Sequence, residues 1–415
     1  SLTLPAGPFL YIAGENISIN IADQTLSGNF TFEQRNDGSV RVTASQVDIT
    51  LTADGADIVV VDNAAGDFEI TTDGIAGALA ITSIAVTIPN VTFTVGETYL
   101  QLNTRPVAVS REIDLGSGTE TVNFPAGPFV RVAVLDVTLS LTGLDASIFG
   151  SFFFDQVGTI TRVAAVDVTA AVDINGSAGN LIDGEGALII TSSGIAASIS
   201  GSLQTSVPGL DAGGALILRI NNTGGVIDEE IEIGADRIKV FFNDTEGMFF
   251  GVALVGATIN IGDIVTIEGN VSFVNSGGRQ VAAGTELTLF IGEGPAKLEN
   301  GEINPFARGL LISNATLGLV KVDGAGGALY ALEANGDVEV IGIADLVLSG
   351  TIRVRVNTFA EAVSETIGIP GPEQSVTVNF DATQTAGITG PYALIEAIGI
   401  TLEVAGQSLV ADLSV

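Results

Sequence analysis

Carboxylates are the only abundant side chains in this chain that could do chemistry. The 415 residues include 48 Asp and Glu against 15 Lys and Arg, and there is no His and no Cys. His is the commonest general base and metal ligand, and Cys supplies thiolate nucleophiles and zinc ligands. Their absence excludes Ser-His-Asp catalysis, Cys-His catalysis and zinc-thiolate sites within this chain. A catalytic or metal site would have to be built from acids.

Three acidic segments occupy similar places along the chain and raise the question of calcium. Calcium takes six to eight oxygen ligands, commonly from Asp side chains and turn carbonyls. Asp62 with Asp67, or Asp183 with Glu185, could therefore contribute part of a site. No segment has the spacing of an EF-hand or of a glycine-aspartate nonapeptide repeat, so hairpin turns are the favoured interpretation and no metal ligand is assigned. The segments are Val61–Ile70, Ile182–Ile190 and Val322–Tyr330.

A denser acidic stretch, "DEEIEIG" at Asp228–Gly234, could suggest the paired carboxylates of a glycoside hydrolase. Its counterparts "SREIDLG" and "SETIGIPG" place it at the start of a strand that recurs along the chain. Charges at such a position discourage strand-to-strand aggregation, and this role is favoured. We therefore predict a protein that is not an enzyme, with no catalytic and no cofactor-binding residue.

Aromatic residues give little sign of a sugar-binding platform. The chain has 20 Phe and 4 Tyr but no Trp. In "SFFFDQ", Phe152 and Phe154 correspond to Phe30 and Phe32, which indicates core packing for both pairs. Tyr330 is the loop residue with which a sugar-binding role would be tested.

Short sequence signatures recur along the chain and indicate how it is divided into repeated units. "LPAGPF" at Leu4–Phe9 returns as "FPAGPF" at Phe124–Phe129, 120 residues later, where the prolines are expected to hold the chain extended as it enters a new unit. A closing signature contains Asn103, Asn222 and Asn357. The predicted units are 1–121, 122–237, 238–375 with an insertion near 297–323, and a partial fourth unit at 376–415.

The chain thus stops inside a unit. Two interpretations are open: a fragment cut from a longer array, which is favoured, or a polymer subunit whose incomplete last unit pairs with a neighbour.

The local pattern within each unit is that of antiparallel β-structure. Ile17, Ile19 and Ile21 alternate with polar residues, which places apolar side chains on one face of a strand. Turn signals rich in Gly, Asp and Asn interrupt the runs, and no window has a convincing helical stripe. We predict an all-β fold of antiparallel sandwich or roll modules stacked into an elongated rod; a continuous β-solenoid is the alternative. The turn signals are Asn36–Gly38, Ala53–Gly55 and Asn335–Asp337.

These signatures resemble a known class of protein. The Asn-Thr pair, the "VNFPAGPF" run and the "SGNFTFEQ" strand are similar to the tandem repeats of very large secreted bacterial surface proteins of the adhesin-like kind. The resemblance covers most of the chain, although the third unit departs at its opening. It implies an extracellular spacer, adhesive or matrix role and supplies no catalytic residues.

Net charge and hydropathy limit the classes of partner that we expect the chain to bind. The formal net charge of −33 repels DNA, RNA and anionic lipid, and no apolar run is long enough for a membrane helix. We expect a structural repeat segment, extracellular or at the cell surface, that contacts its own repeats, neighbouring copies, or a cell surface or matrix. A module that binds polysaccharide or another surface is the alternative.

Overall fold

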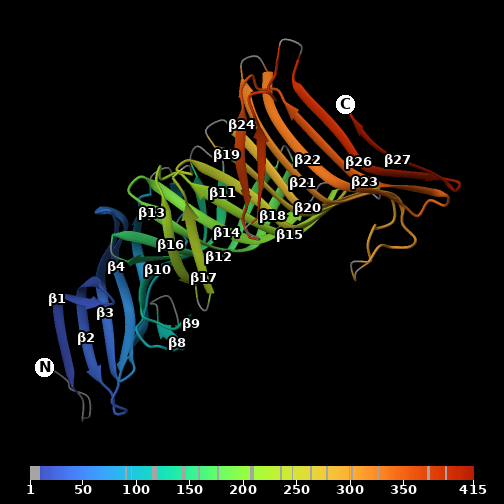
Figure 1. Ribbon diagram of the computed structural model, residues 1–415. Helices are drawn as coiled ribbons and strands as arrows, with labels where there is room; N and C mark the ends of the chain where they lie inside the picture. Colours follow the sequence, from blue (N-terminus) through green and yellow to red (C-terminus); the bar gives the residue numbers. More distant parts are fainter. Residues whose placement is uncertain are drawn as a thin grey trace. The chain divides into compact units, whose positions relative to one another are not determined.

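The computed structural model describes residues 10–88, 91–94, 96–114, 119–141, 146–157, 159–174, 177–205, 210–233, 236–244, 246–261, 264–276, 279–298, 300, 302–324, 327–371, 374–387 and 390–415. Within these ranges the chain is all-β and contains no helix, as predicted (Figure 1). The strands of the described part pair in antiparallel fashion, and most pairs join strands that are consecutive in the chain. The described part also contains no helix that could span a membrane.

The chain divides into two compact units. The first comprises Ser1–Ala170, Asp183–Ser198 and Asn221–Gly247, and the second comprises Ala171–Ile182, Ile199–Ile220 and Met248–Val415. Four strands contribute residues to the two units: β12 (Ile160–Ile174), β13 (Ser177–Thr191), β14 (Gly194–Thr205) and β15 (Leu210–Asn221). The predicted repeat boundaries are finer than this division and stay a prediction.

The first unit is built on an antiparallel sheet in which the order of pairing is β1–β2–β3–β4–β5–β7–β10–β11–β12. A short strand, β6, also pairs with β10. The bounds are β1 (Tyr11–Ile21), β2 (Gln24–Gln34), β3 (Val40–Ala53), β4 (Ala56–Thr71), β5 (Gly74–Val86), β6 (Val91–Phe93), β7 (Glu97–Asn103), β10 (Phe129–Leu141) and β11 (Ala146–Val157).

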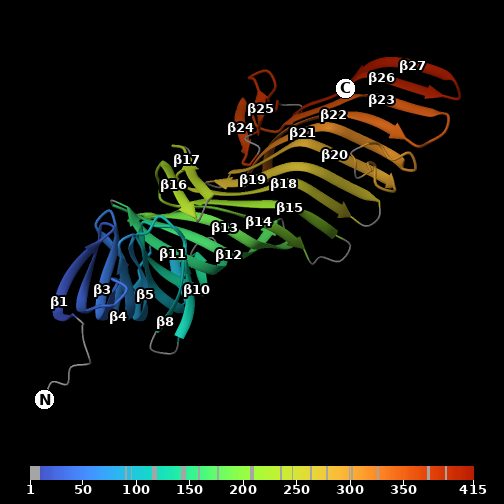
Figure 2. The ribbon, with the colours of Figure 1, turned by 90° about the horizontal axis from the view of Figure 1, so that it is seen from below.

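The second unit repeats this arrangement, with the pairing order β18–β19–β20–β21–β22–β23–β26–β27. Figure 2 shows β20 to β23, β26 and β27 side by side in that order. The bounds are β18 (Phe249–Ile261), β19 (Val265–Ser276), β20 (Arg279–Glu293), β21 (Arg308–Gly324), β22 (Gly327–Ile341), β23 (Leu346–Asn357), β26 (Tyr392–Val404) and β27 (Gln407–Ser414).

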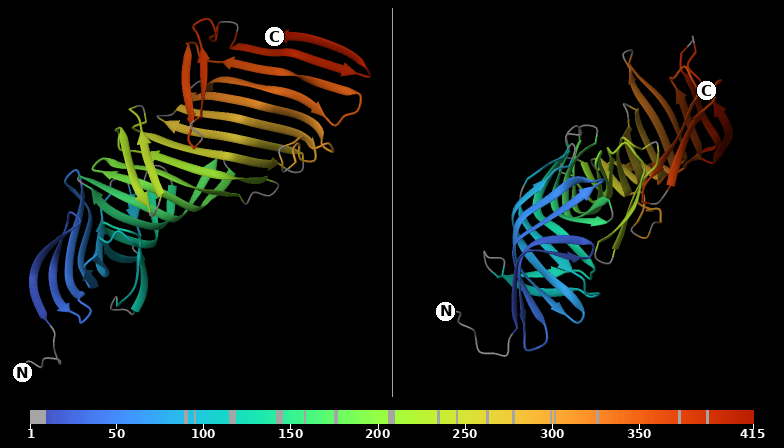
Figure 3. Two further views of the ribbon diagram at one scale, coloured as in Figure 1. Left: turned by 60° about the horizontal axis from the view of Figure 1, so that its bottom comes forward. Right: turned by 90° about the vertical axis from the view of Figure 1, so that its left-hand side faces the viewer.

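Small two-stranded hairpins leave the sheet between long strands. After β7 the chain leaves the sheet, forms one hairpin and rejoins the sheet at β10, which pairs with β7. After β23 the chain does the same and rejoins the sheet at β26, which pairs with β23. The β24–β25 hairpin packs across β19 to β22, as the red and orange strands in the left view of Figure 3 show. The hairpins are β8 (Val109–Asp114) with β9 (Thr119–Phe124), β16 (Ile227–Ile233) with β17 (Asp236–Phe242), and β24 (Val363–Ile369) with β25 (Gln374–Phe380).

The second layer of each unit therefore includes small hairpins packed on a much larger sheet, and the antiparallel meander differs from the coils of a solenoid. Beneath the β24–β25 hairpin, Ile367, Val378 and Phe380 bury their side chains against Val320 and Ala331 of the sheet. Burial of such apolar surface is what fixes a hairpin on a sheet. Stacking of the predicted modules into a rod stays a prediction.

Side-chain alternation along the strands follows the predicted period of two. Ile17 and Ile19 are half-buried and Ile21 is buried, whereas Ser18 and Asn20 between them are exposed. The phenylalanines of the recurring strand also lie where core packing was predicted. Phe30, Phe152 and Phe154 are fully buried, and Phe32 is half-buried.

The prediction of turns was right at Asn36–Gly38 and Ala53–Gly55 but wrong at Asn335–Asp337, which lies inside β22. Gly336 faces a bulge in β21, and a Cβ at this position would lie only 2.8 Å from side-chain atoms of Ile312 and Ala315. A glycine beside small polar residues therefore marks a close approach inside the sheet here, because bulges and tight turns share the same sequence signal.

Bulges with a left-handed residue recur along the long strands. Asn16 in β1, Asp136 in β10 and Gly256 in β18 have φ values of 52°, 54° and 59°, and each interrupts the pairing with the next strand. The three positions are 120 residues apart, the same spacing as the two hexapeptides. A left-handed residue inserted in one strand bends the strand and increases its twist. Bulges thus curve the corresponding strands at corresponding points.

The predicted insertion near 297–323 contains most of the connection from β20 to β21, which covers residues 294–307, and most of β21. Its first part includes an antiparallel bridge between Lys297 and Ile303. Ala296 and Ala307, at the two ends of the connection, pack with Phe290 of β20, so the connection is anchored to the sheet.

Candidate functional site

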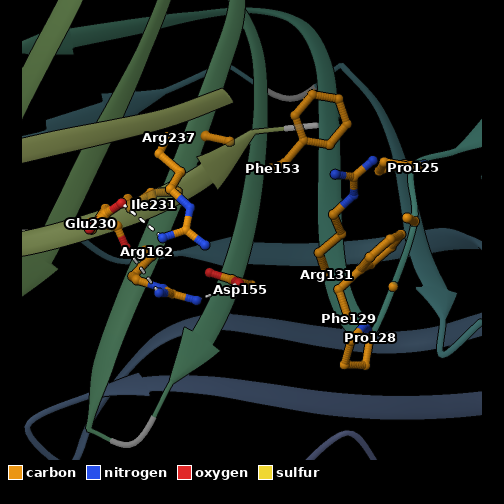
Figure 4. A pocket seen from close by; sticks show the side chains of 13 residues that line it. Pro125, Pro128, Phe129, Arg131, Phe153, Asp155, Arg162, Glu230, Ile231 and Arg237 are labelled. Atoms are coloured by element: carbon orange, nitrogen blue, oxygen red, sulfur yellow. Dashed lines mark hydrogen bonds and ion pairs between the residues drawn. The ribbon is translucent and has the colours of Figure 1, made fainter. Parts of the chain in front are cut away.

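A cavity of about 380 Å³ lies in the first unit, beside the β16–β17 hairpin (Figure 4). It is lined by the loop Pro125–Phe129, by β10, β11 and β12, and by the hairpin. Three arginines line it, although the whole chain has only 15 Lys and Arg. We call it the arginine pocket; its charged lining residues are Arg131, Asp155, Arg162, Glu230 and Arg237.

Strand alternation places these side chains in the pocket. Val130 and Val132 are buried in the core, so Arg131 between them lies on the opposite face of β10. In β11 the buried residues are Phe152 and Phe154, which leaves Phe153 and Asp155 on the pocket face. Asp155 and Arg162 are direct cross-strand partners in β11 and β12. Two faces of the same strands thus serve the core and the pocket.

The guanidinium of Arg131 is held between two aromatic rings. Its central carbon lies 4.5 Å from the ring centre of Phe129 and 4.3 Å from that of Phe153. Its Nε donates a hydrogen bond of 2.9 Å to Oε1 of Gln101 on the neighbouring strand. Burial lowers the pKa of Arg131 to about 10, against an opposing effect of the Asp155 charge. The side chain is therefore a fixed cation at neutral pH, positioned by stacking and by one amide.

The remaining charges of the pocket are paired. Arg162 donates one hydrogen bond of 3.2 Å to Asp155 and another of 3.3 Å to the backbone carbonyl of Glu230. The Glu230 carboxylate forms an ion pair of 3.4 Å with Arg237. Burial raises the pKa of Asp155, with Arg162 acting in the opposite direction. With all five groups ionised, the lining carries one net positive charge, in a chain whose total is −33.

Such a lining can bind a small anion. A guanidinium presents parallel N–H donors that match the two oxygens of a carboxylate or the oxygens of a phosphate. The sequence does not reveal this pocket, because Arg131 and Arg237 are 106 residues apart and come to line one cavity only through the order of the strands. The available signal was an isolated arginine in each of two strands of alternating pattern, "FVRVAV" and "ITRVAAV".

The structure separates the acids proposed for calcium in the first segment. Val61–Ile70 was predicted as a turn, but it lies within β4, where Asn63 has a φ of 60°. Asp62 is exposed, whereas Asp67 is buried and forms an ion pair with Arg41. Asp67 is therefore already neutralised by a protein cation.

The second segment, Ile182–Ile190, was also wrongly predicted as a turn and lies within β13. Asp183 has a φ of 49°, and both Asp183 and Glu185 are exposed. Asp and Asn tolerate left-handed backbone in strands as they do in turns, which explains the two errors. Across the described residues, no group of three or more acidic side chains is arranged to hold a metal ion.

The third segment, Val322–Tyr330, joins paired strands β21 and β22, and residues 325 and 326 at its tip lie outside the described residues. Tyr330 is 40% exposed, near the start of β22. Residues 228–233 of the stretch Asp228–Gly234 lie in β16, as predicted for a strand, and Gly234 lies outside the described residues. Within this strand Asp228 pairs with Lys239 of β17 at 3.0 Å. The first hexapeptide, at Leu4–Phe9, lies outside the described residues.

The second hexapeptide forms the loop from β9 to β10 and lines the pocket, but it bends where an extended chain was predicted. The backbone N–H of Gly127 donates a hydrogen bond of 2.7 Å to the carbonyl of Arg105. A Cβ on Gly127 would lie 2.0 Å from the carbonyl oxygen of Asn103, so no larger residue fits. The close approach to the end of β7 explains the bend.

A buried asparagine stands at the base of each hairpin. It links the point where the chain leaves the sheet to the point where it returns, and we call the segment between these points the hairpin excursion. Asn103, Asn221 and Asn357 end β7, β15 and β23, and each is at most 1% exposed. In each case the side-chain Nδ2 donates to one carbonyl at the start of the excursion and to another at its return, while Oδ1 accepts from the backbone two residues on. We call this arrangement the asparagine latch. The carbonyls are those of Val107 and Pro125, Gly225 and Glu246, and Glu361 and Gln384.

The closing signature is thereby corrected by one residue. The sequence match on Asn-Thr selected Asn222, but the latch residue of the second copy is Asn221. Asn222 instead takes the place of Thr104, since its Oδ1 accepts from Ile195 as the Thr104 hydroxyl accepts from Ile75. The three copies of the motif within the chain share the first asparagine, which is followed by either Thr or Asn.

No family model matches the chain, and a search of curated proteins found no match either.

Proposed function

We propose that this chain is a non-enzymatic structural segment built from β-repeats, part of an extracellular filament, matrix or adhesin-like surface protein. The observation that carries the proposal is the asparagine latch, which recurs with the same atoms at the base of three hairpins among the described residues. A binding or catalytic site needs its residues once, whereas repetition of a purely structural device favours a role in building length and stiffness.

The partner in this role is another repeat of the same kind. The pattern "ITLEVAGQSL" in β26 and β27 matches "ISINIADQTL" in β1 and β2, so Leu409 corresponds to Leu26 and Leu413 to Phe30. Leu26 and Phe30 are 0% and 1% exposed, whereas Leu409 and Leu413 are each 61% exposed. In the first copy β3 pairs with β2 and continues the sheet beyond it. Strands of a further repeat, in the same chain or in a second copy, would cover Leu409 and Leu413.

Small-angle X-ray scattering of the 415-residue chain tests the structural role. A stiff spacer predicts a maximum dimension and radius of gyration well above those of a compact protein of 415 residues, for which the radius is about 22 Å. Extrapolated to zero protein concentration, where chains do not associate, the profile should be the same at low and moderate salt, because charge repulsion would extend a flexible chain only at low salt. A radius near the compact value would contradict the proposal.

A second candidate function is the binding of a polysaccharide or another surface. The specific observation that favours it is the arginine pocket, a concave polar site with a fixed cation. The two functions are compatible, since a repeat segment can carry a ligand site in one of its copies.

A further inference from the structure

We propose that the arginine pocket binds a carboxylate group on a small, hydroxyl-rich body, that is, one acidic sugar unit. The inference names a ligand class for the second candidate function and does not depend on the structural role. It is carried by the cavity, by the charge of its lining and by the hydrogen bonds of Arg131.

Arg131 is the residue with unused donors. Its Nε bonds to Gln101, and the faces of its guanidinium lie against Phe129 and Phe153. The structure shows no hydrogen bond from its two terminal nitrogens to any described residue. Arg131 is half-buried, and an anion that binds both terminal nitrogens would gain two parallel charge-assisted hydrogen bonds. In Figure 4 the guanidinium of Arg131 lies across the pocket from Arg162 and Arg237.

The charge of the lining selects the class of anion. Asp155 and Glu230 neutralise two of the three arginines, so one positive charge remains for the ligand. A carboxylate monoanion matches this charge. A phosphate dianion would face the two carboxylates and leave one negative charge uncompensated, which is costly in a pocket of low dielectric.

The polar groups around the cation favour a hydroxyl-rich body. Asp155 and Glu230 offer acceptor lone pairs and Arg162 offers N–H donors, which together suit sugar hydroxyls. The cavity of about 380 Å³ lies at the small end of the range for ligand sites and fits one sugar ring. The rings of Phe129 and Phe153 are occupied by Arg131, so the site does not need the exposed Trp or Tyr of a stacking platform.

Isothermal titration of the full chain with glucuronate, glucose, acetate and inorganic sulfate at low salt tests the proposal. Glucuronate should bind saturably with one site per chain, glucose should not bind, and acetate should bind at least about tenfold more weakly than glucuronate because it lacks hydroxyls. Acetate or inorganic sulfate binding as tightly as glucuronate would overturn the sugar assignment. No saturable binding of any anion would overturn the site.

Arg131→Gln should weaken glucuronate binding at least about tenfold, because the amide has neither the charge nor the fork of the guanidinium. Arg219→Gln is the matched control, since Arg219 also stacks on a phenylalanine, Phe249, but does not line the pocket. Thermal unfolding without ligand shows whether each variant is folded. If Arg131→Gln is destabilised, Arg131→Lys with an unchanged melting temperature takes its place and should also bind more weakly. Unchanged binding in a folded Arg131 variant would contradict the proposal.

The pH profile gives an independent readout. The ligand carboxylate stays ionised above its own pKa, so binding should be lost as pH rises through the pKa of Arg131, about 10. Burial raises the pKa of Asp155, and its protonation removes a negative charge from the lining. Binding should therefore strengthen as pH falls through the pKa of Asp155. A flat profile would contradict a role for Arg131.

Discussion

At the scale of single residues, the asparagine latch explains why an amide is needed at the end of β7, β15 and β23. Two donors and one acceptor on one short side chain satisfy three backbone groups that would otherwise be buried without partners. No other residue of that size offers this combination. The leading asparagine of the closing signature was visible in the sequence, but its exact position in the second copy was not, because Asn221 is followed by a second asparagine that fills the place of a threonine.

Asn357→Asp tests the latch with almost no change in shape. The aspartate keeps the acceptor for the backbone N–H of Phe359 but loses both donors to the carbonyls of Glu361 and Gln384. It also places a charge at a site that is 0% exposed. The free energy of unfolding should fall by about 3 kcal/mol or more.

Urea unfolding of the two proteins measures the change, with Asn123→Asp as control, since Asn123 is exposed in β9. The control should change stability by less than about 0.5 kcal/mol. Acid should reduce the penalty of Asn357→Asp, because a protonated carboxyl is neutral and regains one donor. Equal effects of the two substitutions would show that the latch does not hold the excursion.

At the scale of elements, the bulges are what distinguishes these strands from ordinary hairpin strands. Asn16, Asp136, Asp167 and Asp183 all have left-handed backbone within long strands. A residue in this conformation costs about 1–2 kcal/mol unless it is Gly, Asn or Asp. The positions therefore restrict the sequence even though the side chains are exposed.

Asp167→Val should destabilise the chain by about 1–2 kcal/mol, since a β-branched side chain is strained at a φ of 53°. Asp167→Gly should be neutral or stabilising at the same site. Thr169→Val in the same strand is the matched control and should be neutral, because Thr169 is exposed and pairs with Phe149 where the register resumes after the bulge. Thermal unfolding of the three variants measures the differences. A harmless Asp167→Val would show that the bulge relaxes without cost.

These bulges also mark the limit of what the sequence could predict. The alternation of Ile17, Ile19 and Ile21 fixes the faces of a strand, because burial follows the period of two. Asn63 and Asp183 give the same local signal as a turn, and whether the chain reverses there depends on pairing with distant strands. The arginine pocket could not be predicted from local sequence patterns, because its lining comes from strands whose order in space is set by the whole unit.

At the scale of the whole molecule, the exposed apolar face of β26 and β27 and the charge of −33 act in opposite directions. Burying Leu409, Leu413 and their neighbours against another copy would gain roughly 1.5–3 kcal/mol per side chain. Repulsion between like-charged chains opposes that contact over the Debye length, about 30 Å at 0.01 M salt and 8 Å at 0.15 M. Association of chains should therefore appear as salt is added.

Light scattering coupled to size-exclusion chromatography measures this over a range of salt and protein concentrations. The average mass of the unmodified chain should rise with both. Leu409→Arg combined with Leu413→Arg should keep the chain monomeric, because each substitution places a strongly hydrated charge on the face to be buried. Val107→Arg is the control, since Val107 is 57% exposed but lies outside β26 and β27. If the control abolishes association while the double variant does not, another surface joins the chains, and the apolar face of β26 and β27 is not the contact between repeats.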